Sequence, residues 1–176
     1  FKNCYLSITS NEIQEKNYET LDNFIWSKQV IDFDYSRNEY EDSDFSKFVT
    51  LAIIGSKKEM KDYTEIEIQK IESFSSTIGY LLHRYKNPAL TKAVVAVDKR
   101  LRSTGENNGR TGKSLLSKAI AKMLNVYLID GKNFKFDSPF PFQMANIDTQ
   151  LINFNDVLKN FDFERLFGMI TEEFTF

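Results

Sequence analysis

Residues 105–116 are Gly105-Glu106-Asn107-Asn108-Gly109-Arg110-Thr111-Gly112-Lys113-Ser114-Leu115-Leu116, and this stretch decides the fold that we expect. Glycines at 109 and 112 permit positive φ angles and let the backbone approach an anion closely. Lys113 is then expected to reach the β and γ phosphates of a nucleotide, and Ser114 to ligate Mg²⁺. The stretch therefore predicts a phosphate-binding loop, whose nucleotide-binding residues are Asn108, Gly109, Arg110, Thr111, Gly112, Lys113, Ser114 and Leu115.

The residues after this loop predict a helix whose N-terminus faces the phosphates. They form one apolar stripe at helical spacing, made of Leu115, Leu116, Ala119, Ile120, Met123 and Leu124. The loop departs from the pattern G-x-x-x-x-G-K-[ST] at Asn107, which stands where the first glycine is expected. Asparagine tolerates the left-handed region better than most residues, so the loop can still close. The alternative interpretation is a surface turn followed by an ordinary amphipathic helix.

A phosphate-binding loop also needs a carboxylate at the end of a nearby buried strand, which holds Mg²⁺ through water. Asp156 directly follows the apolar run 151–154 and is predicted to take this role. Asn155 stands where hydrolytic sites carry a second acid, and an amide cannot take a proton from water. We therefore predict Lys113, Asn155 and Asp156 as catalytic residues and Ser114 and Asp156 as metal ligands, with turnover weakened by Asn155. Asp156 can alternatively be a strand-end turn residue or a helix cap.

The alternation of short apolar runs with helical segments after residue 88 predicts an α/β fold with a mainly parallel sheet. The predicted strands are 93–97, 126–129 and 151–154, and a last amphipathic helix carries Phe163 to Ile170. Before Pro88 the pattern is mainly helical, with one helix capped by Asp44 and ended by Gly55 and another over 64–85. Residues 1–43 are interpreted as a linker or subdomain edge with short helices. The predicted division is thus 1–88, a helical N-terminal region, and 89–176, the nucleotide-binding core.

The composition is that of a soluble globular protein, with 41% hydrophobic and 27% charged residues. The 23 basic and 25 acidic residues give a net charge of −2, so any nucleic-acid contact must come from a local patch or from a surface assembled between subunits. The single Cys4 excludes an internal disulfide and fits a reducing cytoplasm. No apolar run has the roughly 18 residues of a membrane helix. Because Phe1 is no initiator methionine and the sequence stops on an apolar run, we expect a piece of a longer polypeptide.

His83 and a cluster of basic residues near the loop can each be explained without a role in catalysis or binding. His83 lies near the predicted end of the long helix, where the helix dipole favours a histidine. A cluster of basic residues near the loop either contacts nucleic acid or forms a solvated surface; its members are Arg84, Lys86, Lys92, Lys99, Arg100 and Arg102.

Several segments together resemble the phage- and mobile-element-associated primase-helicase proteins, namely residues 78–83 before 92–94, 108–114, 130–132, 148–157, 160–167 and 170–172. The resemblance covers residues 70–176 well and 20–60 loosely. The motor of these proteins is similar to superfamily 3 helicases, a branch of the AAA+ P-loop ATPases. The resemblance therefore implies a P-loop NTPase core, preceded by a mainly helical region. It also implies a DNA-contacting basic segment, a polar sensor and an arginine finger, all expected after residue 176.

The function implied by the resemblance is an ATP-dependent DNA helicase motor with ATP and Mg²⁺ as cofactors. Lys113 and Ser114 match the phosphate-loop positions, and Asp156 matches the Walker B aspartate that holds the metal. The implied partners are single-stranded DNA, identical subunits in a hexameric ring and a fused primase domain, without a membrane, in the cytoplasm of a bacterial host. Two alternatives stay open: a P-loop kinase, because Thr-Gly-Lys-Ser occurs in many P-loop folds, and an assembly module in which Asn155 slows hydrolysis.

Overall fold

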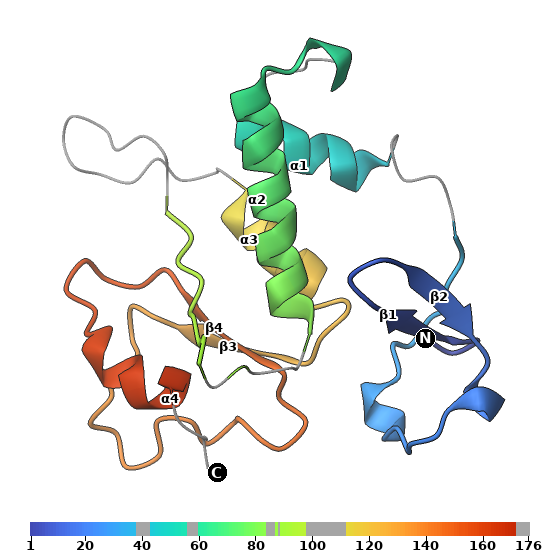
Figure 1. The fold of residues 1–176 in the computed structure, drawn as a ribbon. Coiled ribbons are helices and arrows are strands. Elements are labelled where there is room, and N and C mark those ends of the chain that lie inside the picture. Colours follow the sequence, from blue (N-terminus) through green and yellow to red (C-terminus); the bar gives the residue numbers. More distant parts are fainter. Residues whose placement is uncertain (38–42, 56–59, 84–86, 88, 98–111, 172–176) are drawn as a thin grey trace. The chain divides into compact units, whose positions relative to one another are not determined.

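The structure is a computed structural model, and it describes residues 1–37, 43–55, 60–83, 87, 89–97 and 112–171. The chain forms two compact units, Phe1–Asp42 and Ser43–Phe176. In Figure 1 the first unit is the blue hairpin with its loops, and the second runs from cyan to red. The division that we predicted after residue 88 rests on a change of sequence pattern and stays a prediction.

The first unit is built on an antiparallel hairpin of β1 (Tyr5–Ile8) and β2 (Ile13–Lys16), with Ile8 paired to Ile13. The Thr9 N–H donates to the Glu12 carbonyl at 2.9 Å, and the Thr9 hydroxyl accepts from the Glu12 N–H at 3.2 Å. The sequence interpretation of residues 1–43 missed this hairpin, because strands of four residues offer little alternation. The expected short helices are the 3-10 turns η1 (Tyr18–Thr20) and η2 (Ser27–Gln29).

The N-terminus of the first unit contacts residues 33–35 of the same unit. Asn3 exchanges two hydrogen bonds with the backbone of Tyr35, both of 2.8 Å. The ring of Phe1 lies 5.1 Å from that of Tyr35, measured between centroids. Cys4 beside them is only 3% exposed, which makes it the most buried apolar side chain among the described residues.

The second unit begins with two helices in contact, α1 (Asp44–Ile54) and α2 (Glu65–Leu82). The N-cap of α1 is Ser43, whose hydroxyl accepts from the Ser46 N–H at 3.1 Å, and not the predicted Asp44, which is the first helical residue. Gly55 ends α1 as predicted, with φ 80°. Thr64 and Glu67 form a reciprocal capping box at the start of α2, which ends at Leu82 and not at the predicted Tyr85. The turn η3 (Met60–Asp62) stands before α2.

The sheet of the second unit is the parallel pair β3 (Val126–Asp130) and β4 (Leu151–Asn155), which confirms two of the three predicted strands. Val126 pairs with Leu151 and Asp130 with Asn155. The predicted helix after the phosphate loop is α3 (Lys113–Ile120), and the predicted last helix consists of the turn η4 (Glu164–Leu166) and α4 (Phe167–Thr171). The described residues thus combine helices with two small sheets, one of them parallel, and the α/β class and the P-loop fold both stay predictions.

The predicted strand over 93–97 is absent, and this expectation was wrong. Residues 91–97 have no strand pairing, and Val95 and Val97 are 61% and 78% exposed. The Tyr80 hydroxyl contacts both backbone groups of Lys92, accepting from its N–H at 3.1 Å and donating to its carbonyl at 3.0 Å. Valine-rich composition favours a strand only where a neighbouring strand offers hydrogen bonds, and the described β3–β4 pair leaves these residues unpaired.

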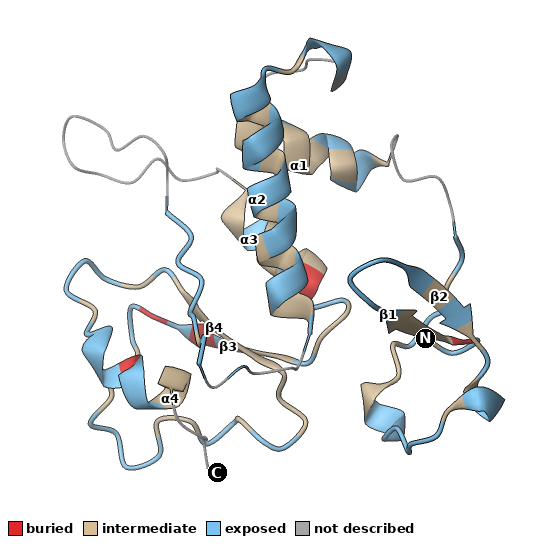
Figure 2. Ribbon diagram, viewed as in Figure 1, coloured by how far each residue is buried: buried red, intermediate tan, exposed pale blue. Residues whose placement is uncertain are grey.

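Few side chains of the described residues are fully buried (Figure 2). In the second unit the buried apolar residues are Ile120, Ile129 and Leu166, with exposures of 4%, 6% and 9%. Ile129 pairs with Phe154 near the carboxyl end of the sheet and Ile120 is the last residue of α3, so the small core sits around the β3–β4 pair. Among the described helices, none combines the length and the apolar character that a bilayer crossing requires.

Candidate functional site

The start of α3 has the geometry of an anion-binding helix end. Gly112 is its N-cap, with φ 89°, and its carbonyl accepts from the N–H groups of Leu115 and Leu116 at 3.0 Å. Glycine has no side chain that could cap N–H groups of this turn. Lys113 and Ser114 occupy the first turn, Lys113 half-buried and Ser114 exposed. Because helix N-termini attract negative charge, the start of α3 is a candidate position for an anion.

Gly112 is needed at this position for two reasons. Its left-handed backbone is costly for residues with a Cβ. In addition, a Cβ at this position would lie 2.8 Å from Cζ and 2.9 Å from Cε2 of Phe48, whose ring comes from α1. Helix α1 thus packs directly against the N-terminal end of α3, a contact that the sequence pattern did not indicate.

The direction of α3 relative to the sheet follows from its two ends. Residues 121–125 connect it to β3, and Asn125 is bonded to Gln150 just before β4, through Asn125 N–H to Gln150 Oε1 and Gln150 N–H to Asn125 O. The C-terminal end of α3 therefore lies near the amino ends of the strands. In the middle, Asn153 Nδ2 donates to Ser117 Oγ at 2.5 Å. The helix consequently runs antiparallel to β4 and directs its N-terminus toward the carboxyl end of the sheet.

The hydrogen bond between Asn153 and Ser117 also allows an estimate of how far Lys113 and Asp156 lie from it along α3 and β4. Lys113 precedes Ser117 by four residues, about 6 Å along a helix, and Asp156 follows Asn153 by three residues, about 10 Å along a strand. Both displacements run toward the carboxyl edge of the sheet. The first turn of α3 and the residues after β4 are thereby brought to the same edge.

Asp156 directly follows β4 and adopts the left-handed region, with φ 52°, the one non-glycine residue of the described chain that does so. Its carboxylate is exposed, and its Oδ2 lies 3.8 Å from Nζ of Lys132, which is equally exposed. Ion pairs as open to water as this one contribute little to stability. The pair nevertheless shows that Asp156 already has a cation beside it.

A second carboxylate, Asp130, stands at the end of β3. Its Oδ2 accepts from Asn133 Nδ2 at 2.6 Å, and its Oδ1 accepts from the Lys132 N–H at 3.1 Å. The hydrogen bond from Asn133, followed by the one from the Lys132 backbone, lowers the pKa of Asp130 below its ordinary value of 3.8. Asp130 is therefore ionised and held in one orientation.

The two strand ends are in tight contact through Gly131. Its N–H donates to the Asn155 carbonyl at 2.7 Å. A Cβ on Gly131 would lie 2.6 Å from Cγ1 of Val157 and 2.8 Å from the Asn155 oxygen. Only glycine allows the chain leaving β3 to pass this close to residues 155–157.

The two faces of the sheet differ in chemistry. Asn153 faces α3, and because side chains alternate along a strand, Asn155 faces α3 as well. Phe154 faces the other way, where its ring lies 5.1 Å from that of Phe134 and 5.4 Å from that of Phe161. Asp130 pairs with Asn155 in register, so its side chain lies on the α3 face. Polar groups therefore line the helix side of the sheet edge and aromatic rings line the opposite side.

The predicted site residues fall into two groups. Gly112, Lys113, Ser114, Leu115, Asn155 and Asp156 are described, and the geometry above brings the helix start and the strand end to one edge. The predicted Asn108, Gly109, Arg110 and Thr111 lie outside the described residues, as do the basic residues Arg84, Lys86, Lys99, Arg100 and Arg102. His83 is the C-cap of α2, as its ordinary explanation expects, and its ring meets that of Tyr80 edge-on at 5.5 Å.

Sequence reasoning missed Asp130, Lys132 and Asn133 as members of this edge. The signal was available, because Asp130 follows an apolar run just as Asp156 does, and parallel strands end at the same edge. Phe48 gave no comparable signal, since it lies more than sixty residues from Gly112.

The donor set at the edge suits Mg²⁺. Ser114 offers a hydroxyl and Asp156 a carboxylate, and Mg²⁺ binds one or two protein oxygens and completes its shell with water and phosphate. Among the described residues no group of three or more His, Cys, Asp or Glu is placed to hold a metal ion.

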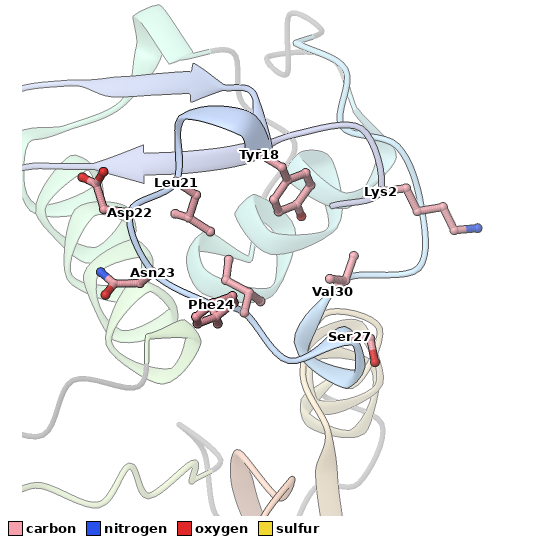
Figure 3. A pocket seen from close by; sticks show the side chains of 9 residues that line it. Lys2, Tyr18, Leu21, Asp22, Asn23, Phe24, Ser27 and Val30 are labelled. Carbon is pink, nitrogen blue, oxygen red and sulfur yellow. The ribbon is translucent and has the colours of Figure 1, made fainter.

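The first unit has a separate, open depression of about 550 Å³, shown in Figure 3. Tyr18, Leu21, Phe24 and Val30 form its apolar lining, and Asp22 is the acid beside them. None of the predicted site residues that the structure describes borders it.

No protein-family model, no curated protein and no solved structure matches this chain.

Proposed function

We propose that the edge formed by the start of α3 and the ends of β3 and β4 binds Mg-ATP, and that the chain is the ATPase core of a DNA helicase motor. The observation that carries the proposal is the hydrogen bond between Ser117 and Asn153. It joins the helix that begins with Lys113 and Ser114 to the strand that ends in Asn155 and Asp156. A phosphate-binding loop and its metal-binding carboxylate require this relation.

Each residue has a defined role in this proposal. Lys113 contacts the β and γ phosphates, and the N-terminus of α3 faces the phosphate oxygens. Ser114 ligates Mg²⁺ directly, and Asp156 holds it through water. Asn155 hydrogen-bonds a water on the α3 face without taking its proton.

The motor assignment comes from the resemblance to primase-helicases. It proposes translocation on single-stranded DNA, a hexameric ring, a fused primase and a bacterial cytoplasm, with the net charge of −2 requiring a local basic patch for DNA. The amide at Asn155 favours one alternative, a nucleotide-binding assembly module that hydrolyses ATP slowly. A P-loop kinase is the other alternative.

The binding test compares two lysines of one helix. Lys113→Ala should weaken the binding of a fluorescent ATP analogue about 10- to 100-fold, because a hydrogen bond to a charged phosphate is worth about 1.5–3 kcal/mol. Lys118→Ala, an exposed lysine further along α3, should leave binding unchanged. Equal affinities of wild type and Lys113→Ala would refute the phosphate site.

Turnover separates the functional alternatives. Asp156→Asn is the suitable variant because asparagine tolerates the φ of 52° while removing the charge. It should abolish most Mg²⁺-dependent hydrolysis, whereas Asp162→Asn, an exposed acid after β4, should not. Stimulation of hydrolysis by single-stranded DNA supports the motor, phosphate transfer to a small acceptor supports the kinase, and tight binding without turnover supports the assembly module.

A further inference from the structure

The proposed site lacks an acid at Asn155 that could take a proton from water, and a carboxylate on the neighbouring strand can replace it. ATP hydrolysis needs a group that orients the attacking water and takes its proton, and the amide of Asn155 cannot take a proton. A carboxylate one strand away, at the same register and on the same face, can act in its place.

Asp130 meets these geometric conditions. It is the last residue of β3 and the register partner of Asn155, the last residue of β4. Both side chains lie on the same face of the sheet as Asn153, which is two residues before Asn155 and hydrogen-bonds Ser117 of α3. Neighbouring parallel strands lie about 4.8 Å apart, a distance that one water molecule spans between the two side chains.

The surroundings of Asp130 hold its carboxylate in place. The Asn133 amide and the Lys132 N–H each donate to one of its oxygens, and each oxygen keeps acceptor capacity for a water. Gly131, the next residue, is bonded to the Asn155 carbonyl at 2.7 Å and fixes the end of β3 against the end of β4. The Lys132 side chain then reaches Asp156 at 3.8 Å, so the turn after β3 contacts both acids of the edge.

We infer that Asp130 is the catalytic carboxylate of this site and orients the water that attacks the γ-phosphate of bound ATP. This inference rests on the proposed function. In the step, the water oxygen forms a bond to the γ-phosphorus while the bond from that phosphorus to the bridging oxygen of ADP breaks. One proton of the water passes to the Asp130 carboxylate and from there to solvent, and ADP and phosphate leave.

The test removes the carboxylate at the end of β3 and then introduces one at the end of β4, in the full chain. Asp130→Asn should lower kcat for Mg-ATP hydrolysis about 100-fold. Its affinity for the fluorescent ATP analogue should stay within about threefold of wild type, as expected for a group that acts only in the transition state. Adding Asn155→Asp to this variant should restore kcat about tenfold or more, because the acid returns to the register-paired position. Asp162→Asn serves as the control and should not change kcat.

The recovery in the double variant is a readout that a merely structural role of Asp130 would not produce. The inference is overturned if Asp130→Asn hydrolyses ATP like wild type, or if the double variant is no faster than Asp130→Asn. It is overturned as well if wild type binds Mg-ATP without any turnover. Failure of wild type to bind Mg-ATP would instead refute the proposed function itself, which the binding measurement shows separately.

Discussion

Replacing Gly131 by alanine tests the close contact that joins the two strand ends. The new Cβ would lie 2.6 Å from Val157 Cγ1, 2.8 Å from the Asn155 oxygen and 2.9 Å from Val157 Cα. Two of these three atoms belong to the backbone and cannot turn away. The strand ends must therefore separate, and the 2.7 Å hydrogen bond from residue 131 to Asn155 must lengthen.

We expect Gly131→Ala to lower the free energy of unfolding by about 1–3 kcal/mol, the range of overpacked sites. Gly79→Ala is the matched control, because Gly79 lies inside α2 and its added Cβ meets no described atom within 4 Å. There the same substitution should stabilise by about 0.5–1 kcal/mol, since alanine has the higher helix propensity. Val157→Ala removes the side-chain contact alone, so it should reduce the effect of Gly131→Ala by about 0.5 kcal/mol or more.

The measurement is urea unfolding of five chains, namely wild type, the three single variants and the Gly131→Ala/Val157→Ala double variant, combined with hydrogen exchange of the amides in β3 and β4. Faster exchange at residues 130–131 is expected in Gly131→Ala alone. If Gly131→Ala is as stable as wild type and its exchange is unchanged, the strand ends are not in contact and Asp130 and Asn155 are not neighbours.

Three further outcomes are expected. Asn133→Ala should raise the pKa of Asp130 toward 3.8, measured by NMR titration of the side-chain carboxyl carbon. Because the folded pKa lies below the unfolded one, Asp130 contributes stability that is present above pH 3.8 and is lost as pH falls through the folded pKa, and this loss should be smaller in the variant. Cys4 should react with a thiol reagent at the rate of global unfolding, since its side chain is 3% exposed and burial raises the pKa of its thiol; rapid labelling of the native protein would contradict this burial. Tyr80→Phe should destabilise by about 1 kcal/mol and speed proteolysis after Lys92, because both hydrogen bonds to that residue are lost.

The sequence alone predicted the elements whose signals are local. The apolar runs at 126–129 and 151–154, the stripe after Lys113 and the glycine after Ile54 predicted two strands, a helix and a helix end, and all four are present. Local patterns succeed there because the period of the side chains and the conformational freedom of glycine act over a few residues. The order Gly112-Lys113-Ser114, followed by an acid after a buried run, also identified the candidate site.

Local patterns failed where long-range pairing decides the structure. The valines at 94, 95 and 97 have high strand propensity, yet a strand requires a neighbour, and the described sheet offers them none. The hairpin of residues 5–16 shows the reverse case, because weakly patterned residues become strands once their turn closes and their backbones pair.

The sequence by itself determined that a glycine, a lysine and a serine begin a helix and that Asp156 ends an apolar strand. Only the tertiary structure decided which other groups stand beside them: Phe48 against Gly112, Ser117 against Asn153, and Asp130 beside Asn155. The physical reason is the register of the parallel pair. A shift of one residue would turn Asp130 to the aromatic face of the sheet, and no local pattern of the sequence specifies that register.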